Sequence, residues 1–297
     1  MRRLWSVVTL AGLGFVLGGV EAWPVPPTGG LVLRDQRGSA LDLEIRGDLK
    51  GAPAGSVRYL TREDLKGLPQ VSYTVADDPN FGGPVLVRGV EIETLARELA
   101  NDGEKAMVVA VCGDLYRGHY PQSYVQAHRP VLVLEINGKA PADWPKSREG
   151  SGSGIGPYLI SHPRFTPSFK TLGNEEEAQI PWGVVRLEFR SEDEILGDIA
   201  PHGAKPEEAE VRDGYQIARQ NCLRCHGPKS YGRLKGQISW AGIAFFADSA
   251  PRDFDAYVRN PRSVTPGAQM PGNPEYNDAT VQALLAYFRT FLTKAKS

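Results

Sequence analysis

The segment Cys222–His226 reads C-L-R-C-H and places two thiols and an imidazole side by side. Thiols at this spacing can each add to one vinyl group of a porphyrin, and the adjacent imidazole then binds the iron as an axial ligand. A C-x-x-C pair also occurs in thioredoxin-like redox sites and in zinc sites. No cysteine or histidine follows His226, so a zinc site lacks its second ligand pair, and the βαβ setting of a thioredoxin site is absent. The sequence therefore predicts one haem c attached to Cys222 and Cys225, with His226 as an axial ligand.

Two amphipathic helices are predicted to position this segment. Acidic residues, which favour a helix start, stand at Glu207, Glu208 and Glu210. An apolar face then recurs at helical spacing and ends at the first cysteine, through Val211, Tyr215, Ala218 and Cys222. Near the C-terminus, Asn277 or Asp278 can cap a second helix, whose apolar stripe is Val281, Leu284, Leu285, Phe288, Phe291 and Leu292.

This part of the chain resembles the class I cytochrome c family over about residues 206–294. The matching residues are Gly214-Tyr215, Cys222–His226, Asp253–Pro261, Pro266–Pro271 and Leu284–Phe288. The resemblance implies an all-α domain over residues 207–297. It also implies that the first and last helices cross, with Gly214 allowing the close approach of an aromatic residue such as Tyr287.

Met270 is the second axial ligand that the resemblance implies. It is the only methionine in this part of the chain and lies in a loop rich in proline and glycine, although most methionines only fill core space. A thioether ligand favours ferrous iron and raises the reduction potential. An iron with His226 and Met270 on its two faces passes electrons and has no vacant position for a reactant. By residue type and analogy, the candidates for contact with the haem propionates are Trp240, Arg259, Arg233 and Arg262, although each can equally be a surface residue.

The residues before this domain are predicted to be rich in β-structure, over about residues 30–190. Short apolar runs separated by Gly, Pro and Asp are strand candidates: Leu31–Leu33, Leu41–Ile45, Val71–Val75, Met107–Val111, Val131–Ile136 and Val184–Phe189. Two short helices are expected at Thr61–Lys66, with Thr61 capping and Asp64 three residues on, and at Glu93–Asn101. Residues 191–206 have the composition of a linker. The predicted fold class is therefore α+β, with a β-rich domain followed by a helical one.

The β-rich part resembles the sulfite-oxidase-type molybdopterin domain through short motifs. These are Leu60–Leu65, Val87–Val90 with Leu95, Val111–Pro121, Val131–Lys139, Gly156–Pro163 and Trp182–Val185. The resemblance implies a molybdenum ligand cysteine before the segment corresponding to Phe81–Leu95, and no cysteine occurs there. Cys112 follows an apolar run and is interpreted as a buried strand-end residue rather than a molybdenum ligand. Molybdopterin is therefore not expected.

Three polar residues in one segment, Tyr116, Arg117 and His119, are the first candidates for any pocket in the β-rich part. His128 and His162 could bind an anion or a metal, but single scattered histidines are more often surface or hydrogen-bonded residues.

The first 22 residues have the pattern of a secretory signal peptide. Arg2 and Arg3 form a charged start, an apolar run extends from Leu4 to Val20, and small residues follow at Ala22. The expected location is the periplasm, where haem attachment to C-x-x-C-H also takes place. An uncleaved signal acting as a membrane anchor is the alternative, and no later stretch is apolar enough to span a bilayer.

Nothing suggests nucleic-acid binding, because no basic run or interleaved aromatic patch is present.

Two functional hypotheses follow. The first is an electron-transfer subunit with redox protein partners, possessing one His/Met-ligated haem and a cofactor-free β-rich domain used for docking or assembly in a redox complex. The alternative is a sulfite-dehydrogenase-like molybdenum oxidoreductase that passes electrons to its own haem. The missing cysteine favours the first hypothesis.

Overall fold

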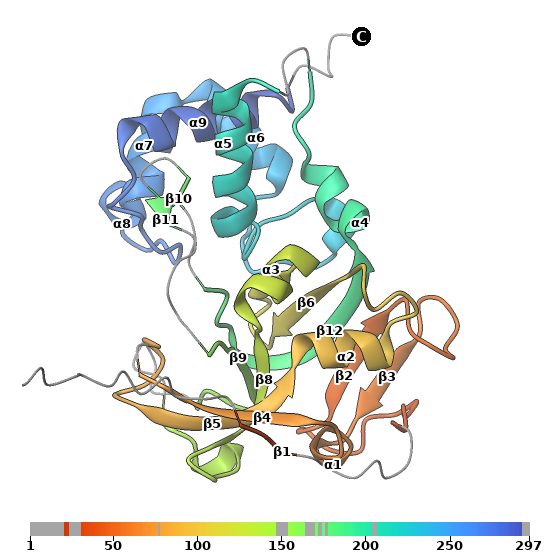
Figure 1. Cartoon of the computed structure of the whole chain (residues 1–297). Coiled ribbons are helices and arrows are strands. Elements are labelled where there is room, and N and C mark those ends of the chain that lie inside the picture. The colour runs from red at the N-terminus through yellow and green to blue at the C-terminus, as the bar shows by residue number, and fades with distance from the viewer. Residues whose placement is uncertain are drawn as a thin grey trace, which may run out of the picture.

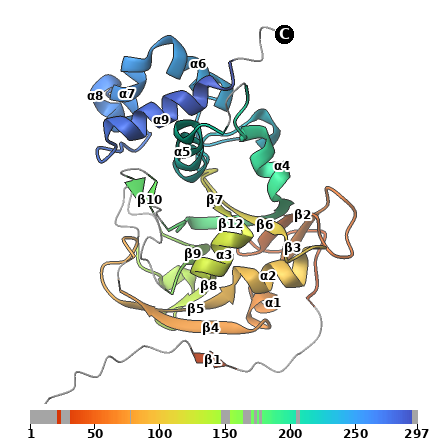
Figure 2. The ribbon, with the colours of Figure 1, turned by 45° about the horizontal axis from the view of Figure 1, so that its top comes forward.

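A computed structural model describes residues 21–23, 31–76, 78–146, 154–163, 170–171, 174–175, 178–203 and 207–292. The fold mixes a large sheet in the first half with helices in the C-terminal region, in agreement with the predicted α+β class. Figure 1 shows the C-terminal helices gathered at one end of the molecule and the sheet, with short helices beside it, at the other, and the tilted view of Figure 2 gives the same arrangement.

The strands belong to one large sheet and one small hairpin. The large sheet holds β1 (Glu21–Trp23), β2 (Leu43–Gly47), β3 (Val57–Leu60), β4 (Gln70–Val75), β5 (Val85–Glu91), β6 (Ala106–Cys112), β7 (Arg117–Tyr120), β8 (Val131–Ile136), β9 (Tyr158–Ser161) and β12 (Trp182–Ser191). Its main path is β1-β4-β5-β8-β9-β12-β2-β3, and β6 and β7 branch from β12. Described neighbours pair antiparallel except β12 and β2, which run parallel. The hairpin is β10 (Lys170–Thr171) with β11 (Asn174–Glu175).

Strand β6 is buried on both of its faces. Val108, Ala110 and Cys112 pack into the core of the sheet region. The alternate residues Met107, Val109 and Val111 belong instead to a cluster formed mainly by the helices. Because side chains alternate across a strand, a strand covered on both sides is apolar at every position. We call the contact between this outer face of β6 and the helices the seam.

Short helices cover the sheet region: α1 (Arg62–Lys66), α2 (Ile92–Leu99) and α3 (Gln122–His128). The predicted cap of the first is confirmed, since the Thr61 side chain accepts from the Asp64 amide at 3.2 Å and Asp64 accepts from the Thr61 amide at 2.8 Å. Helix α2 is confirmed within two residues of its expected ends.

The helical region contains α5 (Ala209–Ile217), α6 (Trp240–Ser249), α7 (Pro251–Arg259), α8 (Pro261–Val264) and α9 (Asp278–Arg289). Both predicted helices are confirmed, and Asn277 caps α9 by accepting from the Thr280 amide at 2.8 Å. The crossing of α5 and α9 is also confirmed. A Cβ at Gly214 would lie 1.9 Å from the Ala283 carbonyl oxygen and 2.7 Å from Tyr287 Cβ. Only glycine allows the two helices to approach this closely.

The segment between the two regions contains more structure than a linker composition suggests. Helix α4 (Glu192–Leu196) begins at Ser191, whose hydroxyl accepts from the Glu194 amide at 3.1 Å, and a single 3-10 turn follows over Gly197–Ile199. Ile195 and Ile199 are buried in the helical cluster. These two apolar residues pack the segment against the helical region. The boundaries of the two domains stay a prediction.

Sequence patterns missed seven of the described strands, and one expected strand was wrong. Leu31–Leu33 contains no strand, because only its neighbour Arg34 forms an isolated bridge, with Tyr59. The missed strands are β1, β3, β5, β7, β9, β10 and β11. Most of the predicted signal peptide lies outside the described residues. Among the residues that are described, no helix has the length and apolar content needed to cross a membrane.

Candidate haem site

The two cysteines and the histidine lie on one turn at the end of the helix that begins with α5. A π-helical segment over Ala218–Cys222 continues α5 to the first cysteine. The Cys222 carbonyl oxygen then accepts from the Cys225 amide at 3.2 Å and from the His226 amide at 2.9 Å. This turn brings both thiols and the imidazole to the same place, and all three side chains are half-buried. π-helical turns are often found at functional sites.

Burial raises the pKa of both thiols. The pKa of Cys222 rises to about 12, and that of Cys225 is also raised, with burial as the largest cause in each case. A reactive redox pair requires the opposite shift, because the thiolate is the nucleophile. The shift of both thiols is therefore opposite to the one that activates a thioredoxin-like redox pair.

The His226 ring is held by one hydrogen bond, which decides the position of its proton. Its Nδ1 atom lies 2.8 Å from the Ile238 carbonyl oxygen. A carbonyl only accepts, so Nδ1 donates and Nε2 keeps its lone pair for a metal. Gly236 packs against the ring, since a Cβ there would lie 2.4 Å from both Nδ1 and Cε1. The donor set thus fits an axial role for His226.

Met270 lies in the loop between α8 and α9 and is half-buried. It packs against the helical cluster, as Cys222 does. The loop is fixed to α7, because the backbone and side-chain nitrogens of Asn273 both donate to the Val258 carbonyl, at 3.1 and 2.9 Å. Met270 is therefore carried by an anchored loop on the same cluster as the first cysteine. Its binding to iron stays a prediction.

The predicted propionate contacts have other partners in this structure. Trp240 is 2% exposed, and its indole N–H donates to the Tyr287 hydroxyl at 3.1 Å. The Arg259 guanidinium donates to Asp255 at 2.5 Å, to Asp278 at 2.8 Å and to the Tyr276 carbonyl.

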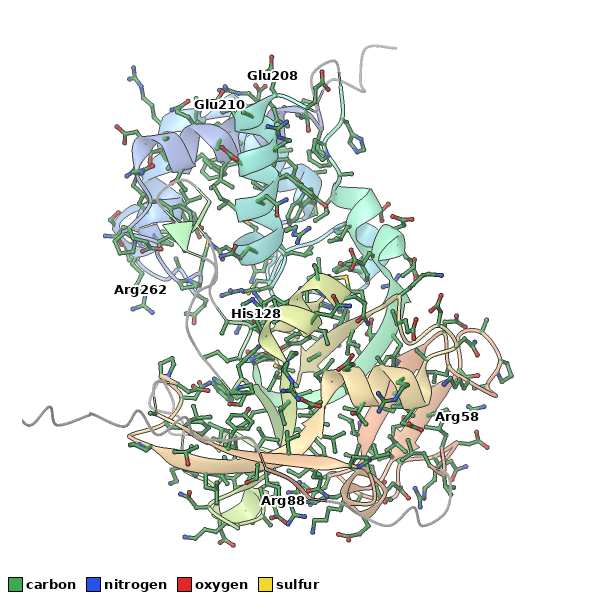
Figure 3. All side chains as sticks on the ribbon, viewed as in Figure 1. Arg58, Arg88, His128, Glu208, Glu210 and Arg262 are labelled. Atoms are coloured by element: carbon green, nitrogen blue, oxygen red, sulfur yellow. The ribbon has the colours of Figure 1, made fainter. Side chains whose placement is uncertain are left out.

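The other two arginines also stay candidates only. Arg262 is exposed at the outer edge of the helical region, as Figure 3 shows. Arg233 lines a cavity of about 400 Å³ beside the loop that follows the motif. None of the four propionate contacts is tested here, and each stays a prediction.

The pocket candidates of the sheet region lie at the seam. Arg117 is 3% exposed, and its backbone N–H donates to the Arg224 carbonyl, between the two haem cysteines, at 2.9 Å. His119 is 7% exposed and stacks on Tyr231, with ring centroids 6.0 Å apart. It also lines a cavity of about 40 Å³, but neither Tyr116 nor Arg117 does.

Of the remaining polar candidates in the sheet region, His162 and Cys112 are buried and His128 is half-buried. His162 is 2% exposed, and its Nε2 lies 3.0 Å from the Tyr124 hydroxyl. Burial lowers the pKa of His162 and of His119 to about 3, so both rings are neutral. Cys112 is 4% exposed, and burial raises its thiol pKa. Among the described residues, no group of three or more His, Cys, Asp and Glu side chains is arranged to hold a metal ion.

Three features of the site escaped sequence reasoning. The Ile238 carbonyl belongs to the main chain, so no residue type signals it. Gly236 gives a weak signal as one of several glycines between His226 and Gly242. The contact between Arg117 and Arg224 joins segments more than a hundred residues apart.

Comparison with known proteins gives two distant similarities. No family model matches the chain. Cytochrome c oxidase subunit 2 of Alkalihalophilus pseudofirmus is 24% identical over 125 residues, which make up 40% of this chain and 36% of that protein. The chain thus spans about a third of the length of this curated relative. The sulfane dehydrogenase SoxCD from Paracoccus pantotrophus is 15% identical with a TM-score of 0.34, over 58% of this chain and 45% of that one. This structural similarity is too low to identify a shared fold.

Proposed function

We propose that the chain is a periplasmic electron-transfer protein with one haem c, attached through Cys222 and Cys225 and bound axially by His226 and Met270. The observation that carries the proposal is the hydrogen bond from His226 Nδ1 to the Ile238 carbonyl. It leaves Nε2 as the metal-binding nitrogen in a turn that also presents two thiols. The match to a protein named cytochrome c oxidase subunit 2 supports a redox role.

Haem iron supplies a one-electron couple when it is bound. The chain's own residues would set the potential and the access. The Ile238 carbonyl fixes the imidazole orientation, and the Met270 thioether favours the ferrous state. A redox protein partner would exchange electrons through the edge of the bound haem. The periplasmic location rests on the signal-like residues 1–22 and on the need for export before haem attachment.

The sheet region is proposed to act as a scaffold for docking or assembly, without a cofactor of its own. Cys112, the thiol of the sheet region, is buried and packs into the core of that region. Direct contacts to the haem-binding loop, through Arg117 and through the ion pair between Asp114 and Lys235 at 2.6 Å, support a structural role.

Purified protein from a periplasmic expression host tests the proposal. We expect a pyridine haemochrome spectrum with the thioether-linked signature and one haem per chain by mass. A non-covalent haem, or none, would overturn it. Metal analysis tests the alternative function on the same sample: about one molybdenum per haem, together with haem reduction by sulfite, would identify a molybdenum oxidoreductase instead.

A further inference from the structure

Arg117 is a buried cation at the edge of the sheet that faces the helices. It begins β7, which Figure 2 places directly below α5. Besides the backbone bond to Arg224, its guanidinium donates to the carbonyl oxygens of Tyr231 at 3.2 Å and Arg233 at 3.1 Å. Its guanidinium carbon also lies 5.5 Å from the centre of the Tyr231 ring. One side chain of the sheet region therefore holds two points of a loop in the helical region.

That loop is the one that fixes the predicted iron ligand. In the sequence, Tyr231 and Arg233 stand between His226 and Ile238. The carbonyl oxygen of Ile238 accepts the hydrogen bond from the His226 ring. The Gly236 amide returns to the Cys225 carbonyl at 2.8 Å, so the loop closes on the motif itself. A shift of the carbonyls that Arg117 holds would be transmitted through this closed loop to the imidazole.

The charge of Arg117 is not neutralised by an ion pair within the part of the chain that the structure describes. Its NH1 atom is buried without a hydrogen-bond partner. Glu188 is the carboxylate with the largest effect on it, but Glu188 is itself paired with Arg186 at 2.7 Å. A guanidinium stays protonated even when buried. A fixed positive charge near an iron centre disfavours the ferric state, which has one more positive charge than the ferrous state.

We propose that Arg117 is a positioning residue of the haem site: it holds the Tyr231–Arg233 loop behind His226 and raises the reduction potential of the haem. The proposal rests on the function proposed above. A residue of the sheet region would thus raise the reduction potential of a haem that the helical region binds.

Two variants at this position separate charge from geometry. Arg117→Met removes the charge and the hydrogen bonds, and we expect its ferric-to-ferrous equilibrium to move roughly tenfold toward ferric, which lowers the midpoint potential by about 59 mV. Arg117→Lys keeps the charge and should return the potential to within about twofold of the wild-type equilibrium. The control is Arg88→Met, because Arg88 is exposed on the part of the sheet far from the helical region (Figure 3). It should leave the potential unchanged.

Amide hydrogen exchange supplies the second readout. Residues 226–238 should exchange faster in Arg117→Met than in wild type, less so in Arg117→Lys, and at the wild-type rate in Arg88→Met. An unchanged potential in haem-loaded Arg117→Met would overturn the inference. If Arg117→Met does not fold, Arg117→Lys still tests the role of the charge. A midpoint potential that falls by about 59 mV in Arg117→Lys would show that the positive charge does not raise the potential. Wild-type protein without covalent haem would instead refute the proposed function, and the exchange rates would still test the positioning.

Discussion

The candidate ligands of the helical region differ in their access to solvent from three residues of the same types in the sheet region, namely Cys112, His119 and His162. Cys222, Cys225, His226 and Met270 are all half-buried. In the sheet region Cys112, His119 and His162 are 4%, 7% and 2% exposed. A cofactor that exchanges electrons with a partner needs residues near the surface, whereas fully buried polar groups are held in their neutral forms.

This difference has an electrostatic consequence. Burial raises the thiol pKa of Cys112 and lowers the pKa of His119 and His162 to about 3. A low dielectric environment disfavours the charged form of each group. Residues whose types suggest chemistry can thus be part of a core. The histidines show this more clearly than the thiols, because burial also raises the pKa of Cys222 and Cys225.

The largest effect that would test this comparison is loss of the haem. Cys225→Ser removes one attachment point, and we expect loss of most covalent haem, measured by haem absorbance per chain. The matched variant Cys112→Ser replaces sulfur by oxygen in the remaining cysteine, the one outside the haem-binding segment. It should keep full haem content and lose roughly 1–3 kcal/mol of stability, because a buried hydroxyl replaces a thiol. Haem loss in Cys112→Ser would contradict the comparison, because the buried cysteine of the sheet region would then also be needed for haem binding.

The next effect concerns the helix crossing that supports the site. Gly214→Val places carbon atoms where the Ala283 carbonyl lies, 1.9 Å from the Cβ position. We expect a loss of about 3 kcal/mol in the free energy of unfolding, since α5 and α9 must separate. Gly197→Ala is the control, because Gly197 has φ −59° and no atom within 4 Å of a Cβ. Urea unfolding followed by circular dichroism checks both, and equal stability would contradict the close crossing.

A smaller change is expected at the second axial position. Met270→Ala should keep haem attached and lower its midpoint potential by on the order of 100 mV, because the soft thioether is lost. Met107→Leu is the comparison, since Met107 is 1% exposed at the seam and fills core space. Spectroelectrochemistry measures both proteins. An unchanged potential in Met270→Ala would exclude Met270 as a ligand.

Sequence patterns predicted the parts of this fold that depend on local chemistry. The Thr61–Asp64 capping box and the Asn277 cap follow from residue types at fixed spacing, and the Gly214 crossing follows from the resemblance to class I cytochrome c. The structure confirms all three. The run at Met107–Val111 was correctly predicted as a strand. Its continuous apolarity also signalled burial on both faces, but the sequence alone does not say what covers each face.

Features that depend on tertiary contacts could not be predicted. The acceptor for His226 is a main-chain carbonyl, which every residue possesses. The role of Arg117 depends on β7, a strand too short to give an apolar pattern. Ile195 and Ile199 dock a segment whose Gly, Pro and acidic composition predicts a linker. In each case the partner is distant in sequence, so no local pattern contains it.

The smallest predicted effect tests whether the buried histidines are neutral. The Tyr124 hydroxyl accepts from the Gln179 amide at 2.8 Å and lies 3.0 Å from His162 Nε2. Burial at this position disfavours the charged form of the His162 ring. The folded pKa of about 3 lies below the ordinary 6.5. The unfolded chain therefore binds more protons between these values, and His162 makes stability fall as the pH falls from about 6.5 toward 3.

His162→Gln removes this proton uptake and keeps a polar side chain at the position. Between pH 6 and pH 5 the wild-type protein should lose about 1 kcal/mol more stability than the variant, since one pKa unit corresponds to about 1.4 kcal/mol. Urea unfolding at the two pH values measures the difference, and titrating carboxylates cancel because both proteins contain them. Equal losses would mean that His162 takes up its proton while folded. The histidines of the sheet region would then be accessible, as the ligands of the helical region are.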